Sequence, residues 1–176
     1  NYGLVAYADG VFLLKKDYKG PIIYYVPYEQ YYGPSYFWPY SGPIYQLPNY
    51  TIVCVDVNRS NINQWAQLWG GPNLALGPGK YNVTFVLETN DTSSSNTGWL
   101  RVWTSTGLNL AYLPINGSDF PAANRWTNFT VSITLNDFED GVQFVGYSWN
   151  WRGTLAFNGV YVVETSEPNA TISSIG

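Results

Sequence analysis

Six short runs of β-branched and aromatic residues constrain the fold of this chain more than any other feature. They are bounded by Gly, Pro, Asn, Asp or Ser and cover residues 81–87, 99–104, 108–115, 129–135, 142–149 and 155–163. Regular short strands separated by turn residues are typical of antiparallel sandwiches and barrels. We therefore expect an all-β protein, an antiparallel β-sandwich whose core block runs over residues 79–164.

Two of these runs alternate strictly between apolar and polar residues. Because successive side chains of a strand point to opposite faces, such runs predict a sheet with one core side and one water-facing side. The core side carries Tyr81, Val83, Phe85, Leu87, Phe129, Val131, Ile133 and Leu135, and the other side carries Asn82, Thr84, Glu88, Asn128, Thr130, Ser132 and Thr134.

Length and charge limit the class of protein. The chain of 176 residues suffices for one domain with a substantial core, which we place at residues 20–176. Only 11% of the residues are charged and the net charge is −4, so nucleic acid is not an expected partner. No run approaches the roughly 18 apolar residues of a spanning helix, so we expect no membrane span.

Three residue types are nearly or completely missing. Histidine is absent, which excludes Ser–His triads and His-ligated metal sites. Cys54 is the only cysteine, so no disulfide forms within the chain, and its apolar run Thr51–Val57 predicts a buried strand. The chain begins at Asn1 and contains no Met, and we expect that a leader has been removed.

Seven Asn-Xaa-Ser/Thr sequons are the strongest sign of cellular location. A chain rich in Asn, Ser and Thr contains some by chance, but seven in one domain favour a secreted protein with dense N-glycosylation. Covalent N-glycans are thus the only non-protein groups that we expect, and no cofactor. The acceptors are Asn49, Asn58, Asn82, Asn90, Asn116, Asn128 and Asn169.

The first residues form a distinct apolar segment. Residues 1–14 carry one charge, and a basic cluster at residues 15–19 follows at once, so we separate residues 1–19 as an N-terminal tail. An exposed apolar segment is costly, so it must pack somewhere. It is either the first strand of its own domain or a donor strand that inserts into a neighbouring subunit.

No catalytic constellation is visible. A glycosidase needs two carboxylates about 5 to 10 Å apart, and none of the acidic residues lies in a setting that marks it as an acid or nucleophile. The acids of Asp137–Gly141 are most simply solvated turn residues, with a structural Ca²⁺ site as the alternative. We expect no enzymatic activity, no catalytic residue and no metal site.

The tryptophans offer a binding function instead. If Leu100 and Val102 face the core, then Trp99, Arg101 and Trp103 face outward. Trp149 and Trp151 share one side of the last part of the chain. Exposed indole rings can stack on the apolar faces of sugars, whereas the alternative is that these rings anchor the core or a subunit interface.

Several segments resemble the jelly-roll domains related to carbohydrate-binding modules. In those domains a turn of the form Pro-Gly-Xaa-Tyr opens a strand, and later strands with Trp, Phe and Val wall the core. The matching segments here are 78–85, 116–120, 126–131, 142–144, 153–155 and 160–162. The resemblance implies a jelly-roll-like β-sandwich, and it carries over no ligand residue.

The whole chain also resembles the subunits of archaeal thread filaments, in its β-sandwich head, apolar N-terminal strand and many sequons. Those subunits form N-glycosylated extracellular filaments linked by donor-strand complementation. The resemblance implies a head-to-tail homopolymer on an archaeal cell surface, with a pilus-like role in adhesion to surface glycans or other filaments. It implies a donor strand made of Leu4, Val5, Ala6, Val11, Phe12 and Leu13.

Two functional hypotheses therefore remain open. The first is a filament subunit at the cell surface that polymerises through its N-terminal segment. The alternative is a secreted carbohydrate-binding module that stacks sugars on Trp99, Trp103, Trp149 and Trp151.

Overall fold

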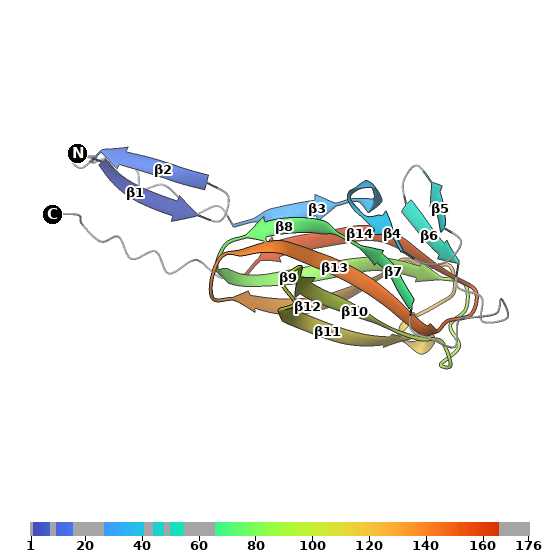
Figure 1. Ribbon diagram of the computed structural model, residues 1–176. Helices are drawn as coiled ribbons and strands as arrows, with labels where there is room; N and C mark the ends of the chain where they lie inside the picture. Colours follow the sequence, from blue (N-terminus) through green and yellow to red (C-terminus); the bar gives the residue numbers. More distant parts are fainter. Residues whose placement is uncertain are drawn as a thin grey trace.

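A computed structural model describes residues 2–7, 10–15, 27–40, 44–47, 50–54 and 66–165, with side chains described for 27–40 and 66–165. Within these ranges, two antiparallel sheets of six strands each face one another and enclose the core (Figure 1). The predicted all-β sandwich is thus confirmed. In the described part of the chain, no helix is long and apolar enough to cross a bilayer.

The sheet nearer the viewer in Figure 1 is called the front sheet. Its strand order is β11-β10-β13-β7-β4, with β8 also paired to β13. The strands are β4 (Trp38–Pro39), β7 (Ala66–Gly70), β8 (Pro72–Leu76), β10 (Thr97–Thr104), β11 (Asn109–Asn116) and β13 (Glu139–Asn150).

The other sheet is called the back sheet. Its strand order is β12-β9-β14-β6-β5, with β3 also paired to β14. The strands are β3 (Glu29–Tyr32), β5 (Ile44–Leu47), β6 (Tyr50–Cys54), β9 (Gly79–Thr89), β12 (Thr127–Leu135) and β14 (Thr154–Glu164). Two short 3-10 helices, η1 (Pro34–Tyr36) and η2 (Gly117–Asp119), lie in the connections.

The six runs recognised in the sequence are strands β9 to β14. In β9, Tyr81, Val83, Phe85 and Leu87 are completely buried, as the alternation predicts. Strand β12 pairs with β9 so that Phe129 lies opposite Phe85 and Val131 opposite Val83. Of the predicted buried strand Thr51–Val57, residues 51–54 belong to β6, whereas residues 55–57 and the side chain of Cys54 lie outside the described part.

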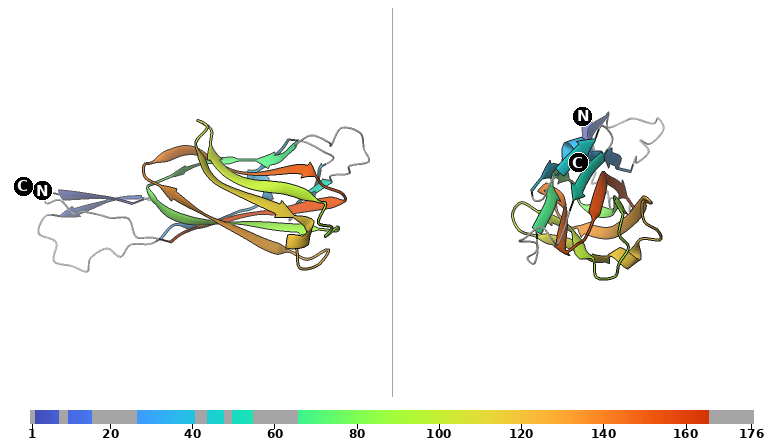
Figure 2. Two further views of the ribbon diagram at one scale, coloured as in Figure 1. Left: turned by 90° about the horizontal axis from the view of Figure 1, so that it is seen from below. Right: turned by 90° about the vertical axis from the view of Figure 1, so that its right-hand side faces the viewer.

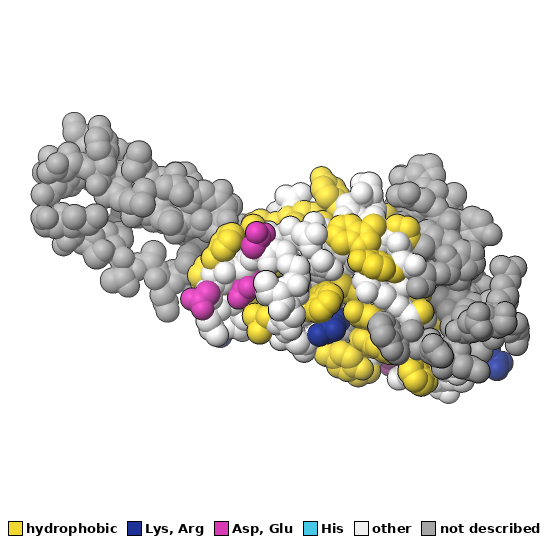
Figure 3. All heavy atoms as spheres, in the orientation of Figure 1, with side chains coloured by type: hydrophobic (Ala, Val, Ile, Leu, Met, Phe, Trp, Pro, Cys, Tyr) yellow, Lys and Arg dark blue, Asp and Glu magenta, His cyan; other side chains and the backbone are white. Residues whose placement is uncertain are grey.

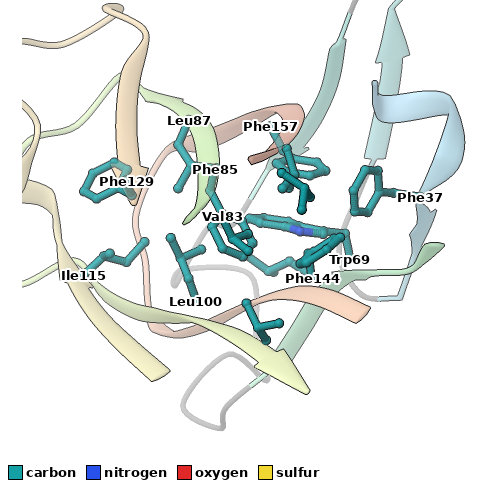
Figure 4. Packing of buried hydrophobic residues seen from close by; sticks show 14 of the residues in the cluster. Phe37, Trp69, Val83, Phe85, Leu87, Leu100, Ile115, Phe129, Phe144 and Phe157 are labelled. Carbon is teal, nitrogen blue, oxygen red and sulfur yellow. The ribbon is translucent and has the colours of Figure 1, made fainter. Parts of the chain in front are cut away.

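The core is built largely from aromatic rings of both sheets (Figure 4). Trp69 of β7 stacks on Phe157 of β14, with ring centroids 4.2 Å apart and an angle of 12° between the planes. Phe37 meets Phe157 edge-on at 4.8 Å. These contacts place Phe37 and strand β7 within the same sandwich as the block 79–164.

One end of the sandwich is closed where β3 begins and β14 ends. The backbone N–H of Tyr28 donates to Oε2 of Glu164 at 3.1 Å, and the N–H of Glu164 donates to the carbonyl of Tyr28 at 2.7 Å. The buried Tyr81 hydroxyl donates to the carbonyl of Gly77 at 2.8 Å. Burial, and secondarily the charge of Glu164, raises the pKa of Tyr81 to about 12.

The N-terminal tail is a hairpin and not one extended strand. Strand β1 (Tyr2–Tyr7) pairs with β2 (Gly10–Lys15), with Leu4 opposite Leu13 and Val5 opposite Phe12. Among the described strands these two pair only with each other, and the left view of Figure 2 shows them beyond the end of the sandwich. The donor-strand role of this segment stays a prediction.

Candidate functional site

The outer side of the front sheet, which we call the aromatic face, carries Trp99, Trp103, Tyr112, Tyr147 and Trp149. Leu100, Val102 and Phe144 point into the core, so Trp99, Arg101 and Trp103 of β10 point outward, as the sequence predicts. By the same alternation Tyr147 and Trp149 of β13 share that side. Figure 3 shows apolar side chains gathered over these strands, with a basic side chain among them.

A row of rings crosses three strands of the aromatic face. Trp99 stacks on Tyr147 with centroids 4.9 Å apart and planes 9° apart. Tyr112 of β11 lies 6.2 Å from Trp99 at 38°. Because β10 lies between β11 and β13, Trp99 has a ring on each side. It therefore presents mainly its edge to solvent and contributes to the site as the centre of the row.

Flat aromatic surface is available at the two flanks. The side chain of Trp149 is 51% exposed and that of Tyr112 is 55% exposed, although both lie on a sheet whose inner side is fully packed. Half-exposed aromatic rings of this kind bind partners that offer apolar surface with polar groups at its margin. Tyr112, at one end of the row, and Trp149, two residues beyond Tyr147 on β13, therefore offer ring surface that a ligand can cover.

Arg101 is the only Lys or Arg in β4, β7, β10, β11 and β13. Its guanidinium carbon lies 4.5 Å from the centroid of the Trp103 ring. Its Nε donates to Oδ1 of Asn109 at 2.8 Å. Trp103 is half-buried and lies under a guanidinium, so it supports Arg101 and does not offer an open ring face.

The aromatic face continues to the other edge of the front sheet. Gln67 of β7 lies opposite Tyr147 in register. A Cβ at Gly70 would lie 2.9 Å from the Gln67 amide, 2.9 Å from the Tyr40 ring and 3.3 Å from the Trp38 ring. These three side chains thus converge where Gly70 leaves room for them. Tyr40 is 54% exposed.

The placement of Trp151 on the outer surface is wrong. Trp151 is completely buried, meets Phe120 edge-on at 5.9 Å and donates from Nε1 to Oγ1 of Thr89 at 3.3 Å. Strand β13 ends at Asn150, so the alternation that relates Trp149 to Trp151 ends there as well. Trp151 therefore packs in the core and cannot stack on a sugar at the surface.

The outer side of β9 and β12 in the back sheet is polar and carries two of the sequons, whereas β3 and β14 of that sheet expose Tyr31 and Tyr161, whose rings lie 4.6 Å apart. Asn128 is exposed and Asn82 is half-buried, with Oδ1 of Asn82 accepting from the Ser132 hydroxyl at 2.8 Å. Asn90 follows β9, and its Oδ1 accepts from the N–H of Thr154 at 2.8 Å, while Asn116 ends β11. Asn49, Asn58 and Asn169 lie outside the described residues. Glycosylation stays a prediction at all seven.

Sequence reasoning missed Tyr112, Tyr147, Gln67 and Tyr40. The alternation of side chains along the run 108–115 would have placed the Tyr112 side chain outward once the partner strand was known, because Tyr112 lies opposite Arg101. No local sequence pattern places Gln67 and Tyr40 beside these rings, because their positions depend on contacts between distant parts of the chain. In the part of the chain that the structure describes, no three His, Cys, Asp or Glu side chains come together as a metal site.

No protein-family model matches the sequence, and no curated protein sequence is significantly similar to it. Solved structures are similar in fold. A xylan-binding module of family CBM15 has a TM-score of 0.57 and 11% identity, over 81% of this chain and all of that one. The carbohydrate-binding and catalytic modules of a Clostridium thermocellum xylanase, solved with xylohexaose, give a TM-score of 0.50 at 14% identity over 80% of this chain.

An arabinofuranosidase with bound arabinose also gives a TM-score of 0.50, at 12% identity over 77% of this chain. This chain spans only 24% of that enzyme and 28% of the xylanase. At these identities the likeness shows the fold alone. The jelly-roll-like β-sandwich expected from the resemblance to carbohydrate-binding modules is thus confirmed, and the resemblance to thread filament subunits stays a prediction.

Proposed function

We propose that this domain is a non-catalytic carbohydrate-binding module that holds its ligand on the aromatic face. The observation that carries the proposal is the difference between the two outer surfaces of the sandwich. The front sheet exposes Tyr112 and Trp149 on the face that carries Arg101. In the back sheet the outer sides of β9 and β12 carry mainly Asn, Ser and Thr, and its exposed rings, Tyr31 and Tyr161, pack on each other 4.6 Å apart. The fold shared with a xylan-binding module supports the same conclusion.

The chemistry of the face suits sugars. A pyranose ring has an apolar side of C–H groups that packs on an aromatic ring, and hydroxyl groups at its margin that need hydrogen-bond partners. Trp149 and Tyr112 supply ring surface, and the half-buried Gln67 supplies an amide. Gln143 is buried and its Nε2 donates to Oδ1 of Asn73 at 2.6 Å. The outward residues of β10, and those of β13 from Gln143 to Trp149, include no carboxylate, so the face lacks the acid pair of a glycosidase.

Replacing the exposed rings tests this function. We expect Trp149→Ala and Tyr112→Ala each to weaken binding to a retained polysaccharide at least about tenfold, which corresponds to about 1.4 kcal/mol. Affinity electrophoresis in gels containing plant, algal and microbial polysaccharides measures the retention. Phe138→Ala is the matched control, because Phe138 is 63% exposed in the turn between β12 and β13, away from the aromatic face.

The unfolding midpoints of the three variants should remain close to that of the wild type, since all three side chains are at least half exposed. A wild-type protein that no polysaccharide retains would contradict the proposed function. So would equal retention of Trp149→Ala, Tyr112→Ala and the wild type.

Polymerisation into a glycosylated cell-surface filament is the second candidate function. The observation that favours it is the hairpin β1–β2, which adds to neither large sheet within the described strands. An apolar hairpin of this kind can pair along the sheet edge of a second copy. We expect deletion of residues 1–14 to abolish filaments in negative-stain micrographs while the unfolding midpoint of the sandwich is kept. Filaments formed by the truncated chain would rule out this mechanism.

A further inference from the structure

We propose that the aromatic face selects an acidic glycan, and that Arg101 binds the carboxylate of a uronic acid residue. This inference rests on the proposed carbohydrate-binding function and adds the class of ligand. It starts from Arg101, the one Lys or Arg in the strands of the front sheet, which lies among the rings of the aromatic face. A neutral sugar needs no such group, and an unpaired cation on an apolar surface calls for a partner.

Two contacts hold the Arg101 side chain in one orientation. The hydrogen bond from Nε to Asn109 fixes one edge of the guanidinium, and the Trp103 ring lies 4.5 Å from its carbon. A guanidinium that packs on a ring keeps its plane and direction, so little freedom is lost when it binds a ligand. The two terminal nitrogens remain as a fork of donors, and they have no acceptor among the described residues.

The described surroundings of Arg101 supply no carboxylate to its guanidinium. The chain has 12 acidic and 8 basic residues, yet no described carboxylate forms an ion pair with Arg101. Figure 3 shows acidic side chains at the opposite end of this face, away from the basic side chain that lies within the apolar patch. Aromatic neighbours lower the local dielectric constant, which strengthens the attraction to an anion.

The strand register places the Tyr112 ring close to the Arg101 guanidinium. Arg101 lies directly opposite Tyr112 on β11 and opposite Val145 on β13. Directly opposite residues have Cβ atoms about 5 Å apart, so a sugar stacked on the exposed Tyr112 ring lies within reach of the guanidinium. The planar fork of an arginine matches the two oxygens of a carboxylate. The arrangement therefore fits a sugar whose ring carries a carboxylate.

Matched pairs of polymers test the inference. Polygalacturonate, alginate and glucuronoxylan are each compared with the same polymer after chemical reduction of its carboxylates to alcohols, which removes the charge and keeps the backbone. We expect the wild type to bind at least one acidic form about tenfold or more tightly than its reduced form. Arg101→Gln should abolish that difference, and Arg101→Lys should restore only part of it, because it keeps the charge without the fork.

Arg125→Gln, which removes an exposed arginine outside the strands of the front sheet, is the control for net charge and should bind as the wild type does. If the wild type and Arg101→Gln bind acidic and reduced polymers equally, the acidic-ligand inference is overturned and the carbohydrate-binding function stands. If neither form of any polymer is retained, both fail. Equal losses in Arg101→Gln and Arg125→Gln would assign the effect to net charge and also overturn the inference.

Discussion

Gly146 shows how one missing side chain sets the packing of the core. It lies on the inner side of β13, opposite Trp69 in register. A Cβ at this position would lie 2.2 Å from Cη2 and Cζ2 of Trp69, which in turn stacks on Phe157. The indole can therefore reach the other sheet only because residue 146 has no side chain. The same residue type at Gly70 makes room for Gln67, Tyr40 and Trp38 on the outer side.

We expect Gly146→Ala to destabilise the sandwich by roughly 1 to 3 kcal/mol, because the added methyl group must displace a packed indole ring. Denaturant unfolding monitored by tryptophan fluorescence measures the change. Gly33→Ala is the control, since a Cβ there meets only ordinary contacts at 3.6 Å or more. Equal unfolding midpoints for the two variants would contradict the packing described for Trp69.

At the scale of strands, alternation of residue type predicts β9 and β12 well, because each has one side in the core and one in water. Strand β13 is different, since its residues from Gly141 to Ser148 are buried on both sides. Val145 faces outward, opposite Arg101, and is nevertheless completely buried. Such a run shows where a strand lies but not which ring ends up exposed.

Strands β3 and β4 were the least predictable. Proline and tyrosine dominate residues 27–40, and the local pattern indicates an ordered loop. In the structure β3 pairs with β14, which lies more than a hundred residues later in the sequence. Strand β4 has only two residues, one of them Pro39, and pairs with β7. Local propensity does not encode such partners. For the same reason, alternation along the strand predicts that Trp99 and Arg101 face outward, but no local pattern identifies Tyr40 and Gln67 as part of the site.

At the scale of the molecule, the closed end of the sandwich joins its first and last described strands. Tyr28 and Glu164 exchange two hydrogen bonds, the N–H of Thr165 donates to the carbonyl of Lys80 at 2.8 Å, and Tyr81 lies buried beside them. Ionising Tyr81 would place a second negative charge next to Glu164 in the interior. The stability of the whole fold is thus linked to the protonation of this one phenol.

The sign of this linkage follows from the raised pKa. The Tyr81 hydroxyl ionises near pH 10 in the unfolded chain and near pH 12 in the folded protein, so the unfolded state loses its proton first. The stabilisation is complete below pH 10 and is lost as the pH rises toward 12. Two pKa units correspond to roughly 2 to 3 kcal/mol. We expect the free energy of unfolding to fall by about this amount more in the wild type than in Tyr81→Phe.

Denaturant unfolding at intervals from pH 8 to 12 measures the difference, and the slope against pH is the quantity to compare. Tyr81→Phe lowers stability at neutral pH by about 1 kcal/mol, because the hydrogen bond to Gly77 is lost, but this loss does not change with pH. Tyr28, whose pKa is raised mainly by burial and to a smaller extent by Tyr81, is the neighbouring tyrosine that the variant also affects. Parallel curves for the two proteins would show that Tyr81 is not the group that links the closed end of the sandwich to pH.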